Sequence, residues 1–110
     1  MGVRVFRLPA ESDGRLNLVS VCGFLYDSGI KTLMVEGGLK VISSFLSTDL
    51  VDKVIITISP RFAGGRNVTI AVPAGGRFPE LVSITQLQLG DDLIIEGYVK
   101  KDDRQETVLH

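Results

Sequence analysis

The chain has 110 residues, 45% of them hydrophobic, which is enough to build one small domain with a core. Its formal net charge is −1, and neither a basic stripe nor interleaved aromatic residues support nucleic-acid binding. A single cysteine excludes an internal disulfide and fits a reducing compartment. No apolar run is long enough for a membrane span, and no apolar signal region begins the chain, so we expect a cytoplasmic protein without membrane partners.

The first two predicted elements are a short strand and a helix. Alternation over residues 3–8 predicts the strand, which Pro9 ends because proline cannot donate to a ladder. Asn17 is the expected helix N-cap, and Gly29 lies where a helix-ending glycine belongs. Apolar residues recur between them at helical spacing, at Leu18, Val21, Cys22 and Leu25. We interpret Cys22 as a small buried hydrophobe, because no basic neighbour would activate its thiol.

The middle of the chain predicts a second strand–helix–strand unit. Residues 30–35 are apolar and resemble a strand buried on both faces, and residues 39–46 carry an apolar helical stripe that should end near 47–49. Residues 54–58 are the most strand-like run, and they are expected to be central in the sheet. Residues 61–79 are irregular, with a brief strand possible at 68–72, and such a loop either covers a ligand or only connects strands.

The last part of the chain predicts an antiparallel hairpin. Residues 81–89 alternate, but the phase slips, which indicates a bulge or a sharp twist near 85–86. Residues 90–92 are a turn signal, and 93–99 form the returning strand. The polar residues 101–110, which contain the single histidine His110, are expected to fray. The fold class is therefore α/β, with a parallel βαβαβ core and a C-terminal antiparallel hairpin.

The sequence Glu36-Gly37-Gly38 is the strongest candidate site, because it joins a predicted strand to a predicted helix. Free backbone N–H groups at such a helix start can bind a phosphate. The alternative is a tight turn that needs positive φ, with Glu36 as a carboxylate that stabilises the helix dipole. A metal site is not expected, since no second cysteine or histidine completes a ligand set.

Several segments together resemble a known family, namely Leu33–Gly38, Ser44–Leu46, Leu50–Val54 and Ile58–Pro60. As a set they are similar to the reductase of riboflavin biosynthesis, whose domain has a dihydrofolate-reductase-like fold. The likeness is greatest to the fungal enzymes, which reduce 2,5-diamino-6-ribosylamino-4(3H)-pyrimidinone 5′-phosphate. It runs from Val3 to about Lys100, and the N-terminal half of the family domain has no counterpart in the chain.

The resemblance implies an NADPH-dependent reduction of the ribosylamino group to a ribitylamino group by a homodimer. It implies that Glu36 faces the substrate near the nicotinamide. It places the pyrophosphate of NADPH on a helix start made of Gly37, Gly38, Leu39, Lys40, Val41 and Ile42. Residues 1–100 would be the C-terminal part of the reductase domain, and 101–110 a polar tail.

Two other interpretations of the function stay open. One is a non-catalytic homologue that acts as an interaction or assembly module, since part of the family domain has no counterpart here. The other is a general α/β nucleotide-binding domain unrelated to riboflavin. Arg7, at the end of the first predicted strand, is either a partner for the 2′-phosphate of NADPH or a solvated surface residue.

Overall fold

A computed structural model describes residues 2–62 and 79–101 of the chain. The predicted strand at 68–72, most of the predicted loop, and residues 102–110 with His110 lie outside the described residues. The chain divides into two compact units, Met1–Val35 and Glu36–His110, and each is described by itself.

Helix α1 of the first unit spans Leu18–Asp27, and its start is capped as the sequence predicts. The Asn17 side-chain oxygen accepts a hydrogen bond from the Ser20 N–H at 3.0 Å. The Asn17 amide group in turn donates to the Glu11 carboxylate, also at 3.0 Å. This second bond fixes which end of the amide faces the helix, so one otherwise orphaned N–H is satisfied.

The end of α1 confirms the expected glycine. Gly29 has a φ of 94°, and its N–H donates to the carbonyl of Tyr26 at 3.0 Å. The N–H of Ile30 reaches back to the carbonyl of Leu25, also at 3.0 Å. These two bonds define a Schellman motif, which requires a left-handed residue at the position that Gly29 occupies.

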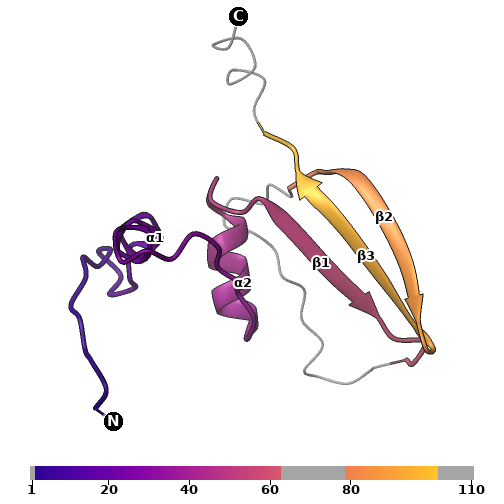
Figure 1. Cartoon of the computed structure of the whole chain (residues 1–110), viewed down its shortest axis with the longest axis horizontal. Helices are drawn as coiled ribbons and strands as arrows, with labels where there is room; N and C mark the ends of the chain where they lie inside the picture. Colours follow the sequence, from indigo (N-terminus) through magenta and orange to yellow (C-terminus); the bar gives the residue numbers. More distant parts are fainter. Residues whose placement is uncertain (1, 63–78, 102–110) are drawn as a thin grey trace, which may run out of the picture. The chain divides into compact units, whose positions relative to one another are not determined.

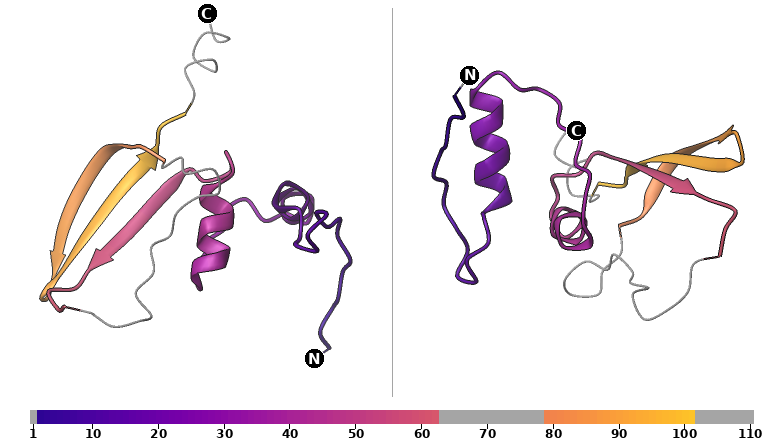
Figure 2. Two further views of the ribbon diagram at one scale, coloured as in Figure 1. Left: turned by 180° about the vertical axis from the view of Figure 1, so that it is seen from behind. Right: turned by 90° about the horizontal axis from the view of Figure 1, so that it is seen from below.

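The predicted strands at 3–8 and 30–35 are not formed in the described part of the chain. Residues before Pro9 instead run beside α1, where the Phe6 and Phe24 rings lie 4.7 Å apart between centroids (Figure 2). Apolar alternation makes a segment suitable for a sheet, but a strand needs a neighbour that accepts and donates its backbone hydrogen bonds. In this unit the only bridge within the described residues joins Ala10 and Leu16.

Helix α2 of the second unit spans Leu39–Leu46, as predicted. Its end is closed by hydroxyl groups rather than by a glycine. Ser47 Oγ donates to the carbonyl of Ser43 at 2.8 Å, and Thr48 Oγ1 donates to the carbonyl of Phe45 at 2.6 Å. Thr48 Oγ1 also accepts from the Leu50 N–H at 3.2 Å, which turns the chain toward the next strand.

The second unit contains a three-stranded antiparallel sheet (Figure 1). Its strands are β1 at Lys53–Ile58, β2 at Leu81–Leu89 and β3 at Asp92–Val99, in the order β1-β3-β2. All pairing between the described strands is antiparallel, so the parallel core is not confirmed. The prediction that β1 is central is wrong for this sheet, because β3 lies between the other two. Apolar residues on both faces of β1 predict burial of those faces and do not fix the number of neighbouring strands. In the described residues the faces of β1 are not buried, since Ile55, Ile56 and Ile58 are exposed.

The phase slip in β2 is a real irregularity, although it lies earlier than predicted. The register against β3 shifts between Val82 and Thr85, and Ser83 in that gap has a φ of 54°. The shift brings Ile84 over the same side of Gly97 as Leu81. Gly97 is the one described residue that is buried.

The β2–β3 connection confirms the predicted hairpin turn. Leu89 pairs with Asp92, so the turn has two central residues, Gly90 and Asp91. Gly90 has a φ of 61°, whereas Asp91 has no positive φ. This is the pattern of a type II′ turn, in which glycine stands first.

Apolar side chains in the described residues stay largely accessible. Exposed fractions are 90% at Val3, 74% at Met34 and 60% at Leu87, and no described hydrophobic residue is buried. Such surfaces normally lie inside a domain or against a partner. Among the described residues, no helix is both long and apolar enough to cross a membrane.

Candidate functional site

The candidate site begins at the two glycines before α2, which have different backbone conformations. Gly37 has a φ of 125°, a backbone conformation that residues other than glycine rarely adopt. Gly38 is the N-cap, with an ordinary φ of −67°. A Cβ added at Gly38 meets no atom within 4 Å. The turn geometry therefore explains glycine at position 37, but neither φ nor packing against the described residues explains it at 38.

The first turn of α2 offers backbone donors without acceptors in the described residues. The first N–H that is bonded within the helix belongs to Ile42, which donates to the carbonyl of Gly38 at 3.1 Å. Gly38 has no side chain to cap the earlier groups, and no acidic residue lies in the first turn. The N–H groups of Leu39, Lys40 and Val41 consequently stay available to an anion. The exposed Lys40 adds a positive charge.

Glu36 lies two residues before the N-cap and is exposed. Within the described part of the chain, its carboxylate takes part in no hydrogen bond or ion pair. The alternative role, a carboxylate that stabilises the dipole of α2, needs no hydrogen bond and stays open. Its carboxylate is available to accept a hydrogen bond from a ligand at the start of α2.

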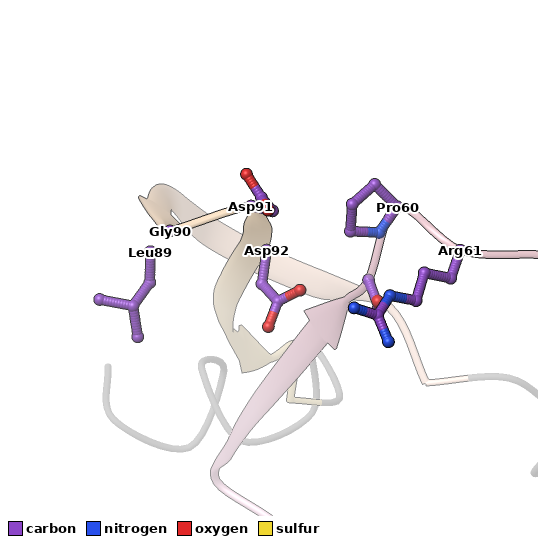
Figure 3. A pocket seen from close by; sticks show the side chains of 7 residues that line it. Pro60, Arg61, Leu89, Gly90, Asp91 and Asp92 are labelled. Carbon is purple, nitrogen blue, oxygen red and sulfur yellow. The ribbon is translucent and has the colours of Figure 1, made fainter.

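A hollow lies at the other end of β1, beside the β2–β3 turn (Figure 3). No local sequence pattern marks it, because its lining comes from two separate segments, one after β1 and one at the β2–β3 turn. It is lined by Ser59, Pro60, Arg61, Leu89, Gly90, Asp91 and Asp92. One guanidinium and two carboxylates give this lining a formal charge of −1. It offers polar donors and acceptors, but it is a poor match for a phosphate.

The remaining candidates belong to the first unit. Cys22 is half-buried, which is less than the fully buried position expected of it. Arg7 is exposed, as a surface arginine would be, and forms no ion pair within the described residues. In those residues, no three histidine, cysteine or acidic side chains gather around a possible metal ion.

Comparison with protein families gives one match that covers most of the chain. Residues 3–95 match the family described as RibD C-terminal domain. The matched range contains Glu36, the two glycines, all of α2, and β1. It ends within β3, so the sheet falls mostly inside the family match.

Five curated relatives carry the same name, 2,5-diamino-6-ribosylamino-4(3H)-pyrimidinone 5′-phosphate reductase. The protein of Methanothermobacter thermautotrophicus is 36% identical over 92 residues, which is 78% of this chain and 42% of that protein. That of Archaeoglobus fulgidus is 39% identical over 64 residues, which is 58% of this chain and 29% of the relative. The relative from the yeast Debaryomyces hansenii is 42% identical over 74 residues, covering 63% and 29% respectively. The chain thus spans less than half the length of each of these relatives.

Proposed function

Because the chain belongs to the RibD C-terminal domain family, we propose that it forms the cofactor-binding part of a reductase of riboflavin biosynthesis. The substrate class is a ribosylamino-pyrimidinone 5′-phosphate, which is the compound in the names of its relatives. The observation that carries the proposal is the family match over residues 3–95, with the accessible start of α2 inside it.

The proposed cofactor is NADPH, with its pyrophosphate at the start of α2. Supporting this, the free N–H groups of the first turn suit an anion, and the open space at Gly38 lets a phosphate approach the backbone. When bound, NADPH would supply the hydride that reduces the ribosylamino group to a ribitylamino group. The residues of this chain bind and orient the cofactor. They are Gly37, Gly38, Leu39, Lys40, Val41 and Ile42.

Glu36 is the proposed substrate contact. Its carboxylate is exposed and lies directly before the turn that would hold the cofactor. A carboxylate accepts hydrogen bonds from the hydroxyl and amino groups that the proposed substrate carries. Since hydride transfer requires substrate and nicotinamide to be adjacent, a substrate-facing group is expected beside the cofactor site.

The complete fold is proposed to be dihydrofolate-reductase-like, with residues 30–35 as a parallel strand beside β1. Two features support this. Residues 30–35 carry exposed apolar side chains, and the outer edge of β1 has no partner among the described residues. α2 would be the right-handed crossover between the two strands. Residues 1–100 would form part of a cytoplasmic, homodimeric reductase domain, and residues beyond Lys100 a polar tail.

Titration of the full chain with NADPH, followed by cofactor fluorescence, tests the proposal. Saturable binding is expected. A parallel titration with NADH measures how much the 2′-phosphate contributes to affinity. Binding of NADPH, NADH and simple adenine nucleotides with equal affinity would favour a general nucleotide-binding domain. No binding at millimolar NADPH would contradict the proposed cofactor site.

A second candidate function is an assembly module that does not catalyse reduction by itself. The observation that favours it is the exposure of apolar side chains in the described residues, including Leu87 at 60% and Met34 at 74%. Under this function, the faces that stay accessible would be covered only in an assembly. Turnover with substrate and NADPH separates the two functions, because both predict association of the chain but only the reductase predicts reduction of the substrate.

A further inference from the structure

Lys101 makes three contacts with the segment that joins α2 to β1. Its Nζ donates to the carbonyl of Val51 at 3.0 Å and to the carbonyl of Asp49 at 3.3 Å. The same Nζ lies 3.4 Å from Oδ1 of Asp52. A lysine ammonium has three N–H donors, so these three acceptors match its full donor capacity. The sequence interpretation of Lys101 as the first residue of a polar tail gives no hint of this.

The three contacts fix a short segment from both sides. Before it, the hydroxyls of Ser47 and Thr48 close the end of α2. After it, the carbonyl of Asp52 accepts from the N–H of Val99 at 2.9 Å, one step beyond the β1–β3 ladder. Lys101 secures the residues between these points, because no other group in the described part of the chain donates to the carbonyls of Asp49 and Val51. The residues that follow β3 thereby fix the segment that connects α2 to β1.

Lys100, the preceding residue, forms a different kind of contact. Its Nζ lies 3.7 Å from Glu80, and the two side chains are 52% and 72% exposed. A surface pair of this kind contributes little. Lys101 is less exposed, at 38%, and two of its three acceptors are backbone carbonyls. A substitution at Lys100 can therefore serve as the control for the same substitution at Lys101.

We propose that Lys101 is a positioning residue for the cofactor site, because it sets the direction of α2 relative to β1 and β3. The inference rests on the proposed function of the α2 start. α2 has eight residues, a length of about 12 Å, so a tilt of about 10° at its end displaces its start by about 2 Å. Displacements of that size are enough to weaken contacts that depend on alignment. Lys101 thus acts on Gly37 and Gly38 through the helix, without touching the cofactor.

The test compares Lys101→Met, which keeps the aliphatic stem but removes the donors, with Lys100→Met in the full chain. Residual dipolar couplings of backbone amides report the direction of α2 relative to β1 and β3 without any ligand. In the wild type and in Lys100→Met, helix and sheet couplings should fit one common alignment. In Lys101→Met they should not, and the Kd for NADPH should rise roughly tenfold.

The outcomes separate this inference from the proposed function. Failure of the wild type to bind NADPH contradicts the function, while the couplings still decide the role of Lys101. An unchanged helix direction in Lys101→Met overturns the inference, even if the melting temperature falls. If Lys101→Met does not fold, the same couplings are measured on Lys101→Arg, which keeps the positive charge but not the single ammonium that reaches all three acceptors. Asp52→Asn should have little effect, because the Asp52 side chain is 87% exposed.

Discussion

At the scale of single residues, the two glycines before α2 have different backbone conformations. Gly37 is required by its backbone conformation, since its φ is 125°. Gly38 has an ordinary φ and open space around its Cα. A sequence motif of two glycines cannot distinguish these cases. The structure leaves position 38 as the one where glycine is expected to serve a ligand.

Replacement of Gly38 by valine should weaken NADPH binding without unfolding the protein. The added side chain meets no atom of the described chain but occupies the path of a phosphate to the backbone. Loss of the preferred N-cap residue should lower the free energy of unfolding by only about 1 kcal/mol. The Kd from fluorescence titration and the melting temperature check the two parts.

Gly37→Ala is the contrasting variant at the neighbouring position. Alanine at a φ of 125° is strained, which should cost about 1–3 kcal/mol of stability. If Gly38→Val instead lost stability and binding together, glycine 38 would be a purely structural requirement of the turn.

Gly97 gives a prediction about stability alone. A Cβ at this position would lie 3.0 Å from Leu81 Cβ and 3.4 Å from Ile84 Cγ1. Overpacking of this kind should lower the free energy of unfolding by about 1–3 kcal/mol in Gly97→Ala. Urea denaturation measures the loss, and Gly23→Ala in α1, with nothing within 4 Å of its added Cβ, is the control. Equal stability of Gly97→Ala and the wild type would mean that β2 readily shifts away from β3.

At the scale of elements, the sequence predicted those whose signals are local. Asn17 and Gly29 mark the two ends of α1 through hydrogen bonds to residues within about one turn, and Gly90 supplies the positive φ of the hairpin turn. The bulge in β2 was visible as a phase slip but was placed too late, because the alternation itself does not show where the extra residue sits. Strands 3–8 and 30–35 depend on distant partners, so their sequences alone do not decide whether they form.

The proposed pairing of residues 30–35 with β1 predicts a pattern of amide hydrogen exchange. The bond from Val99 to Asp52 fixes the alternation along β1, so the N–H of Ile56 points toward β3. The N–H groups of Ile55 and Thr57 point away from it. If a strand pairs with the outer edge, all three amides should exchange slowly.

The same measurement contains its own control within β1. Protection of the Ile56 amide reports the β1–β3 ladder whether or not the outer edge is paired. Fast exchange at Ile55 and Thr57 beside slow exchange at Ile56 would show a free outer edge, against the proposed parallel core.

At the scale of the whole molecule, the candidate site was predictable as a position but not as an environment. Glu36 and the glycines lie before a helix of the expected length, but the strand predicted at 30–35 is not formed in the described residues. The hollow beside Arg61 was not predicted, because it joins residues from two turns that lie far apart in the sequence. The contacts of Lys101 link residues about fifty positions apart and left no local signal for the same reason.

Exposed apolar side chains lead to a prediction about association. We expect the chain to sediment as a species heavier than its monomer mass of 11.9 kDa at micromolar concentration. Because apolar contacts are not screened by ions, the association should persist in about 0.5 M salt, roughly three times the physiological ionic strength of about 0.15 M. Analytical ultracentrifugation over a dilution series measures both. A stable monomer throughout would contradict the homodimer and the assembly module alike.

The strand order has a consequence for the way the sheet is assembled in time. β2 and β3 are joined by a two-residue turn, so their hairpin is a local structure that forms within about 1–10 μs. β1 joins β3 only when residues 59–92 have been closed into a loop between Ile58 and Leu93, which costs chain entropy before any contact repays it. Folding of the sheet should therefore begin at Gly90 and end at the outer strand. The last backbone hydrogen bond to form joins the N–H of Val99 to the carbonyl of Asp52. It lies next to the contact between Lys101 Nζ and the Asp52 carboxylate.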